Sequence, residues 1–185
     1  LQQQTGGEAN TPKPSLPTSP SPAPENPAPT QPAAADAPQP PAKSEPAAPL
    51  CFCLPVQGAK TIAPFSGGEL VKNHTLNVWR THDGIDLAAE KGTVVTAAEA
   101  GTVSAVTMDP MWGGTVAVDH TDGTQTIYCG IAPEKALKAG DRVTAGQMLG
   151  SVDTVTAEVA MESHLHFAAK KDGKFIDPLS LPGLE

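Results

Sequence analysis

The chain has 185 residues, among them 20 Pro, 4 Phe, 2 Trp and 1 Tyr, and a formal net charge of −8. These averages combine two different regions, because 14 of the 20 Pro and no aromatic residue fall within residues 1–50. A region so poor in large apolar side chains cannot bury enough surface to offset its ordering entropy. We therefore predict a disordered Pro/Ala-rich stalk or linker over 1–50, a connecting segment over 51–60 and one folded domain over 61–185.

Charge and hydropathy exclude several classes of protein. The net charge is −2 over residues 1–50 and −6 over the rest, without a cluster of Lys or Arg, which argues against nucleic-acid binding. No run of 18 apolar residues exists that could span a membrane. Leu1 is followed by Gln and Gly rather than by the basic and apolar regions of a signal peptide. Because a natural chain seldom begins at Leu, we expect a targeting or anchoring segment before residue 1.

The three cysteines allow several interpretations. Cys51 and Cys53 flank Phe52, and Cys129 lies well inside the domain. The pair could bind a metal, or one of its members could form a disulfide with Cys129 outside the cell. Three cysteines do not make a disulfide framework, and no neighbouring residues complete a four-ligand metal set. Free, half-buried thiols are therefore favoured.

From residue 60 onward, short alternating apolar runs are separated by Gly, Asp and Pro. These runs predict strands of four to six residues at 93–96, 101–106, 115–118 and 125–128. One short helix is expected over Ala132–Ala139, ended by Gly140. Closely spaced turns with strands between them predict an antiparallel all-β domain, either a sandwich or a barrel-like sheet.

Two Asp-Gly pairs predict hairpins in this domain. Asp122-Gly123 is typical of a two-residue turn in which both positions have positive φ. His120, just before it, is expected to be a solvated residue at a strand end. The segment Lys171–Lys174, which contains the other Asp-Gly pair, predicts a second hairpin near the end of the chain.

Two histidine clusters carry the candidate chemistry. The first is HDGIDL at residues 82–87, and the second is HLHF at 164–167. Residues two apart share one face of a strand, so His82 and Asp86 are predicted to point one way and the intervening apolar residues the other. In the second cluster both imidazoles share one face in the same manner. Each cluster therefore combines a polar face with an apolar face that enters the core.

If the two strands are neighbours, two imidazoles and one carboxylate converge. Zn²⁺ favours such a set, and a catalytic zinc site has three protein ligands and one open position. The remaining histidine would lie beside that position, where it could act as a general base or stabilise an oxyanion. Either cluster alone is typical of surface polar residues, but the two together favour a metal site.

The histidine clusters belong to a longer series of motifs. In chain order these are HxGxDxAA from His82, GTxV from Gly92, GxV from Gly101, Asp122-Gly123, Tyr128, GDxVxxGQxLG over 140–150 and HLHF over 164–167. The series resembles the lysostaphin/LytM-type zinc metalloendopeptidases over about residues 61–182. The resemblance implies that His82, Asp86 and His166 hold Zn²⁺ and that His164 is a catalytic histidine. It also implies a substrate in the peptide part or cross-bridge of peptidoglycan.

Two departures from this family bear on activity. Active members usually have a histidine two residues after the tyrosine, whereas here Tyr128 is followed by Cys129 and Gly130. Glycine has no side chain to stabilise a substrate oxyanion, and losing one such partner costs on the order of 10²–10³ in rate. Residues 160–163, Ala-Met-Glu-Ser, replace a Gly/Pro-containing turn. The implied zinc ligands are therefore complete, but one of the two catalytic histidines is missing.

This combination resembles a non-lytic, sporulation-type branch of the family. Members of that branch are anchored in the forespore membrane, face the intermembrane space and bind a partner from the mother-cell membrane. The resemblance implies an extracytoplasmic location, an anchor upstream of this chain, and a membrane-anchored sporulation protein or a peptidoglycan peptide as partner. A 50-residue stalk at about 3.1 Å per residue would reach on the order of 150 Å, which suits such a location.

Three functions remain open. One is an active zinc endopeptidase with His164 acting beside the metal. Another is a zinc-binding scaffold, weakly active or inactive, that binds a partner protein or a cell-wall peptide. The third is a lipoyl- or biotinyl-type carrier, which shares the short strands and the GQxLG segment but needs a lysine at a hairpin tip, and none lies at residues 160–162. Gly130 favours the scaffold, and whether the protein is an enzyme stays open.

Overall fold

The structure, a computed structural model, describes residues 49–184. All but the last two residues of the predicted stalk lie outside this range, so the stalk stays a prediction. Within the range, all strand pairs are antiparallel. This confirms the prediction of an antiparallel all-β domain. Over the same residues, no helix has the length and hydropathy that crossing a membrane requires.

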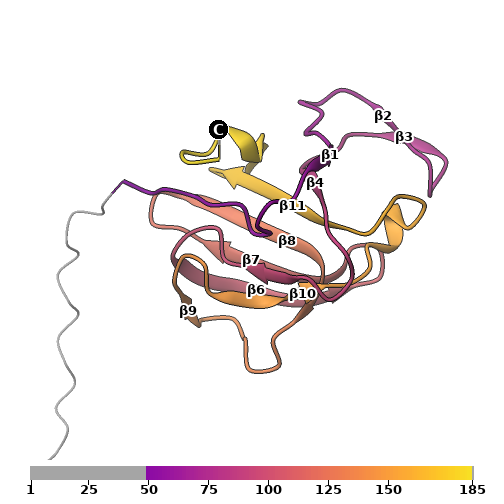
Figure 1. The fold of residues 1–185 in the computed structure, drawn as a ribbon. Helices are drawn as coiled ribbons and strands as arrows, with labels where there is room; N and C mark the ends of the chain where they lie inside the picture. The colour runs from indigo at the N-terminus through magenta and orange to yellow at the C-terminus, as the bar shows by residue number, and fades with distance from the viewer. Residues whose placement is uncertain (1–48, 185) are drawn as a thin grey trace, which may run out of the picture. The chain divides into compact units, whose positions relative to one another are not determined.

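One large sheet contains most of the strands (Figure 1). Its main path runs β1 (Thr61–Ala63), β4 (Ile85–Ala88), β11 (His164–Lys171), β8 (Thr124–Pro133), β7 (Gly113–Asp119), β6 (Gly101–Asp109) and β9 (Arg142–Val143). Off this path lie β10 (Met148–Val152), which pairs with β8 and β5 (Val94–Thr96), and β12 (Lys174–Ile176), which pairs with β11. A separate hairpin and two 3₁₀ turns complete the described elements: β2 (Val71–Asn73), β3 (Val78–Arg80), η1 (Thr156–Glu158) and η2 (Pro178–Ser180).

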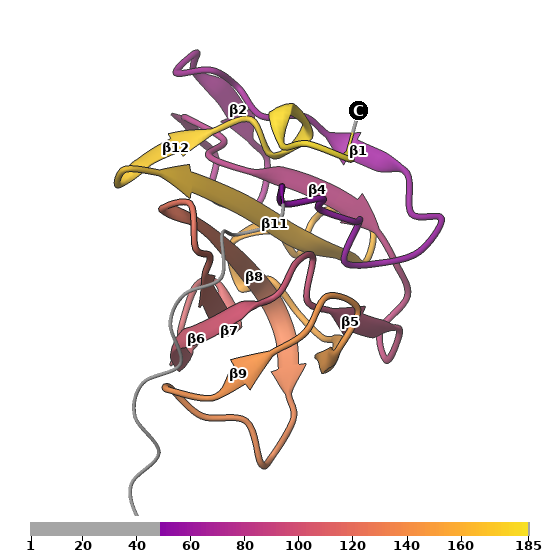
Figure 2. The same ribbon diagram turned by 90° about the vertical axis from the view of Figure 1, so that its left-hand side faces the viewer.

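The core lies between two groups of strands. Figure 2 shows β1, β4, β11 and β12 in one group and β5, β6, β7 and β9 in the other, with β8 between them. The largest fully buried side chains include Tyr128 from β8 and Phe167 from β11. Phe52, ahead of the first strand, is also buried, and its backbone N–H donates to the Pro182 carbonyl oxygen at 2.7 Å. This hydrogen bond joins the residues just before the first strand to those at the end of the domain, and the Phe52 side chain contributes to the core.

The predicted helix over 132–139 does not form. Ala132 and Pro133 instead end β8, where they pair with Ser151 and Gly150 of β10. Two physical reasons favour this outcome. A residue that precedes proline is disfavoured in the helical region, and β10 supplies the backbone partners that the segment needs.

The two Asp-Gly turns differ from each other. Asp172 and Gly173 both have positive φ, 49° and 79°, which confirms a two-residue hairpin between β11 and β12. In the β7–β8 turn, only Gly123 has positive φ, 80°, and Gly123 N–H donates to the His120 carbonyl oxygen at 3.2 Å. The prediction of two positive φ angles was wrong there. Asp122 instead accepts hydrogen bonds from Thr124 N–H at 2.9 Å and from the Lys171 ammonium at 2.8 Å.

His120 is buried rather than solvated, because β8 carries a complementary series of hydroxyl groups. Its Nδ1 donates to the Ala100 carbonyl oxygen at 2.8 Å, which leaves Nε2 to accept from the Thr126 hydroxyl at 2.8 Å. Thr126 in turn accepts from the Tyr128 hydroxyl at 3.0 Å, and that hydroxyl accepts from Ala98 N–H at 2.8 Å. We call His120, Thr126 and Tyr128 the hydroxyl chain.

Candidate metal centre

The two histidine clusters meet on adjacent strands. Residues 164–167 of β11 pair with 85–88 of β4, and this register places His166 directly opposite Asp86. Ile85 and Leu87 are fully buried beside them, so the predicted alternation of faces holds in β4. His82, however, lies in the loop before β4 and does not share its strand face as predicted. There the Ser66 hydroxyl accepts a hydrogen bond from His82 N–H at 3.0 Å and fixes the approach to the site.

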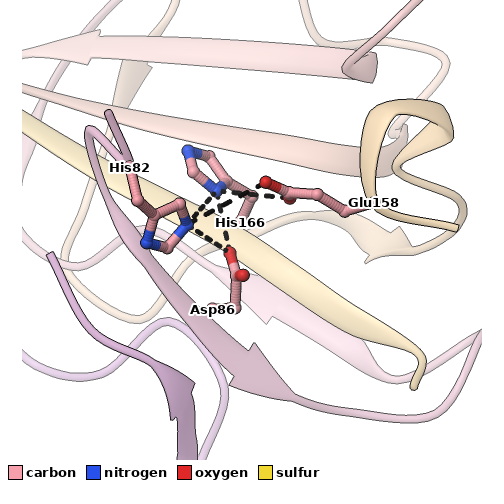
Figure 3. Close-up of side chains that lie close together, drawn as sticks. All are labelled: His82, Asp86, Glu158 and His166. Atoms are coloured by element: carbon pink, nitrogen blue, oxygen red, sulfur yellow. Dashed lines mark hydrogen bonds and ion pairs between the residues drawn. The ribbon is translucent and has the colours of Figure 1, made fainter. Parts of the chain in front are cut away.

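Figure 3 shows four buried side chains that point toward one another: His82, Asp86, His166 and Glu158. Asp86 Oδ1 lies 2.8 Å from His166 Nδ1 and 3.2 Å from His82 Nε2. The two imidazole nitrogens are 3.3 Å apart. The structure thus brings together the three residues that the resemblance implies as zinc ligands.

The protonation of His82 shows why this cluster suits a cation. Its Nδ1 donates to the Pro64 carbonyl oxygen at 2.7 Å, so Nε2 of the neutral ring carries a lone pair. That lone pair faces Asp86 Oδ1 and His166 Nδ1. A hydrogen bond from the outer ring nitrogen to a carbonyl is also the usual support of a metal-ligating histidine. Ligand atoms of a tetrahedral zinc, at about 2.0–2.1 Å from the ion, lie about 3.3 Å apart. The two distances from His82 Nε2, 3.2 and 3.3 Å, match this value, and the 2.8 Å between Asp86 and His166 is shorter.

The pKa shifts of Asp86 and His82 also indicate that this cluster favours positive charge. Burial alone would raise the pKa of the Asp86 carboxyl, but hydrogen bonds with His166 and His82 hold it well below its usual value. Burial lowers the pKa of His82 and is the largest single cause, but the hydrogen bond and charge of Asp86, the Pro64 carbonyl and the charge of Glu158 together outweigh it, so the net shift is upward. Both shifts mean that positive charge is favoured between these side chains, and a divalent cation would supply it.

Glu158 is the member of this cluster that sequence analysis missed. It ends η1, is 5% exposed, and places Oε2 at 3.7 Å from His166 Nδ1 and Oε1 at 4.0 Å from His82 Nε2. It lies more than 70 residues from His82 along the chain and belongs to no motif. The departure from the family at residues 160–163 begins two residues after Glu158 and does not include it, so no motif pointed to this carboxylate.

His164, the implied catalytic histidine, is buried and engaged by this carboxylate. Its Nε2 lies 3.3 Å from Glu158 Oε2 and 3.9 Å from Asp86 Oδ1, and its Nδ1 donates to the Glu162 carbonyl oxygen at 2.7 Å. Burial lowers the pKa of His164, but the hydrogen bond with Glu158 and the one to the Glu162 carbonyl raise it above its usual value. The imidazole beside the cluster is therefore held in place by the chain itself.

Gly130 lies beneath the segment that carries Glu158. It has φ of +76°, and a Cβ built there would lie 2.3 Å from Val155 Cγ2. Its carbonyl oxygen accepts from Asp153 N–H at 2.7 Å. The place where active family members have a second histidine is thus filled by residues 153–155 of the same chain.

The Trp112 ring, with Arg80 beyond it, covers the His166 side of the cluster. The Trp112 ring packs on the His166 ring with centroids 4.5 Å apart, and the Arg80 guanidinium lies 5.0 Å from the Trp112 centroid. A cavity between the β2–β3 hairpin and the site is lined in part by Phe65, His82 and Glu158. One route to the cluster therefore runs beneath this hairpin, and a second cavity reaches His166 beside Trp112.

The three cysteines are free thiols. Cys51 and Cys53 are exposed, and Cys129 is buried in β8 opposite His166. Burial raises the pKa of Cys129 to about 11, so its thiol stays protonated near neutral pH. Its place beside the site is therefore that of a small apolar side chain.

The fold and the buried histidine–carboxylate cluster define a LytM-type domain. The family model of peptidase family M23 matches residues 80–178, more than half of the chain. The chain therefore belongs to peptidase family M23. Members of this family are typically zinc metallopeptidases.

Relatives of this chain include both a sporulation protein and peptidases. Stage II sporulation protein Q of Bacillus subtilis is 34% identical over 106 residues, which cover 56% of this chain and 37% of that protein. The DD-carboxypeptidase/endopeptidase Mpg of Neisseria meningitidis is 30% identical over 106 residues, covering 57% of this chain and 24% of Mpg. The chain thus spans well under half of the length of either relative.

Among solved structures, the SpoIIQ–SpoIIIAH pore-forming complex contains a similar chain. The two align with a TM-score of 0.64 and 26% identity, over 74% of this chain and 94% of that chain. This domain is therefore related both to a protein solved in a complex and to a peptidase.

Proposed function

We propose that this domain binds one Zn²⁺ through His82, Asp86 and His166 and serves as a weakly active or inactive scaffold. The observation that carries the proposal is the combination of an intact ligand set with Gly130, whose surroundings are filled by Val155. A histidine cannot occupy that position without displacing the neighbouring segment. The ligands are thus retained where half of the catalytic pair is absent.

The scaffold is proposed to act outside the cytoplasm, held by an anchor upstream of this chain. Its partner is a membrane-anchored sporulation protein or a peptidoglycan peptide. Support comes from the similarity to the SpoIIQ chain of the SpoIIQ–SpoIIIAH complex and from the membership of peptidase family M23. The predicted Pro/Ala-rich stalk over 1–50 would hold the domain away from such an anchor.

An active peptidase is the second candidate function, because Mpg is also a relative and His164 is present. A zinc ion in such a site would act as a Lewis acid toward a peptide carbonyl. The residues of this chain would hold that ion, keep His164 beside it and exclude water with the Trp112 ring. The engagement of His164 by Glu158 argues against efficient turnover.

Metal analysis tests the zinc site. Protein purified without chelator is expected to contain one zinc per chain, and Asp86→Ala is expected to contain none. Asp83→Ala, three residues away and outside the cluster, is the matched control and should retain the metal. Zinc absent from the unmodified protein, or unchanged in Asp86→Ala, would refute the proposed site.

Peptidoglycan digestion separates the two functions. Purified protein loaded with zinc is expected to release almost no fragments from cell walls that an active lysostaphin-type peptidase digests. Robust digestion by this protein that is abolished by His164→Ala would establish the peptidase and overturn the scaffold.

A further inference from the structure

We propose that Glu158 is a fourth protein ligand of the metal, so that the domain closes its own site. The inference rests on the proposed zinc site and goes beyond it, because three ligands leave a position open whereas four do not. Tetrahedral zinc sites with four protein ligands are structural, and those with three are catalytic. Glu158 would therefore decide the class of site to which this centre belongs.

The position of the carboxylate supports this assignment. One ligand atom from each of His82, Asp86, His166 and Glu158 can be chosen so that all lie within 4.8 Å of one another. In Figure 3, Glu158 enters from the side of the cluster opposite His82. Its Oε2 lies 3.7 Å from His166 Nδ1 and its Oε1 lies 4.0 Å from His82 Nε2. Each distance is slightly longer than a tetrahedral edge, and a small side-chain rotation toward a bound ion would bring one of these oxygens closer.

The burial of Glu158 points to a positively charged ligand. A buried carboxylate without a compensating charge is strongly disfavoured. Within residues 49–184, the ion-pair partners of Glu158 are three imidazoles, those of His82, His164 and His166, and no Lys or Arg. Two of these imidazoles already share Asp86. A divalent cation at the centre would balance both carboxylates.

The segment that bears Glu158 is fixed on two sides. Ala157 N–H donates to the Met111 carbonyl oxygen in the β6–β7 turn at 2.8 Å. From the β2–β3 hairpin, the Asn73 side-chain amide donates to the Ala157 carbonyl oxygen at 3.0 Å, and Thr75 Oγ1 accepts from Ala160 N–H at 3.0 Å. These hydrogen bonds hold the backbone around Glu158 in one position, so that binding a metal would cost little additional ordering entropy.

Gly130 and Glu158 are parts of one arrangement. Val155 lies against Gly130 and begins the turn that places Glu158 three residues later. A side chain at position 130 would push Val155 outward and with it the start of η1. Because position 130 has no side chain, Val155 can pack against it, and the turn that follows Val155 places Glu158 at the cluster.

Cobalt substitution tests this assignment. Metal-free protein is reloaded with Co²⁺, whose visible absorption depends on coordination number, and Zn²⁺ affinity is measured by chelator competition. For Glu158→Gln, we expect a changed Co²⁺ spectrum and Zn²⁺ binding weaker by more than about 100-fold, because loss of a mere outer partner of a zinc ligand already costs roughly 10- to 100-fold. Glu162→Gln, the same change at an exposed residue four positions on, should match the unmodified protein in both measurements.

A second variant protects the test against misfolding. Glu158→Asp keeps the charge but shortens the side chain by one methylene, so it should also lose affinity while folding normally. Unchanged spectrum and affinity in folded Glu158→Gln, with metal lost in Asp86→Ala, would overturn the assignment of Glu158 and leave the zinc site standing. Failure of the unmodified protein to bind either metal would overturn both.

Discussion

Two buried histidine networks in this domain differ in what satisfies them. In the hydroxyl chain, donors and acceptors alternate from Ala98 N–H through Tyr128, Thr126 and His120 to the Ala100 carbonyl oxygen. At the metal centre, the lone pair of His82 Nε2 instead faces a carboxylate and a second imidazole. The first network is completed by hydroxyl and backbone groups, whereas the second gathers two imidazoles and two carboxylates, the donor set that the proposed zinc site would use. Burial of a histidine alone therefore does not distinguish the two networks, whereas the groups around its ring nitrogens do.

The substitution with the largest expected effect places a side chain at Gly130, where Val155 leaves no room for one. Gly130→His should lower the free energy of unfolding by about 2–5 kcal/mol, because a non-glycine residue at positive φ costs about 1–2 kcal/mol and overpacking against Val155 about 1–3 kcal/mol. The same variant should not restore peptidoglycan digestion. Chemical denaturation and a digestion assay check both expectations.

A matched pair of variants isolates the contact with Val155. Gly130→Ala carries the same backbone penalty, and its cost should fall when combined with Val155→Ala. Equal costs of Gly130→Ala with and without Val155 would show that the segment over Gly130 is not the obstacle.

Removal of metal should affect one network and spare the other. At free zinc 100-fold above its Kd, the ion stabilises the fold by about 2.7 kcal/mol, and a chelator should remove that amount. Asp86→Ala should show no response to chelator, as measured by thermal unfolding. A chelator response that persists in Asp86→Ala would contradict the assignment of the metal to this cluster.

Tyr128→Phe tests the hydroxyl chain by removing the hydroxyl that links Ala98 N–H to Thr126. Ala98 N–H and Thr126 would lose their partner in the core, at a cost of about 1–3 kcal/mol in unfolding free energy. Zinc content should not change. Denaturation and metal analysis of the same preparation measure both effects, and loss of zinc in this variant would show that the networks are coupled.

Alkaline pH should weaken the hydroxyl chain in a defined window. Burial raises the pKa of Tyr128 to about 12, against about 10 in the unfolded chain. The neutral hydroxyl is thus favoured in the folded state, and its contribution is complete below pH about 10. Between pH about 10 and 12 the unfolding free energy should fall by about 1.4 kcal/mol per unit. Tyr128 is the only tyrosine in the sequence, so tyrosinate absorbance reports this residue alone, and its ionisation near pH 10 in folded protein would contradict the burial.

The sequence predicted which side chains of β11 face the site, but not the loop position of His82 or the presence of Glu158. Alternation in HLHF placed both imidazoles on one side and Phe167 in the core, because strand geometry dictates that pattern. The position of His82 in a loop could not be predicted, since Ser66 and Pro64 fix it from another part of the chain. Glu158 was missed for the same reason: its place depends on contacts with Met111 and Asn73, which no local pattern reveals.

The fold class followed from turns and short apolar runs, but two local predictions failed where distant strands intervened. Residues 132–133 extend β8 because β10 lies alongside. His120 is buried because Thr126 and the Ala100 carbonyl oxygen supply partners for its two ring nitrogens. Local sequence specified strand and turn tendencies, and tertiary hydrogen bonding set the outcome at these positions.

The packing of Val155 on Gly130 also limits how this domain could change its function by stepwise substitution. A histidine at position 130 meets Val155 before it can meet a substrate, and a smaller residue at 155 leaves Gly130 without a catalytic side chain. For the inactive scaffold proposed above, neither single step would bring activity, because Glu158 would still engage His164. Under that proposal, several coordinated changes would be needed for peptidase activity, each without benefit by itself.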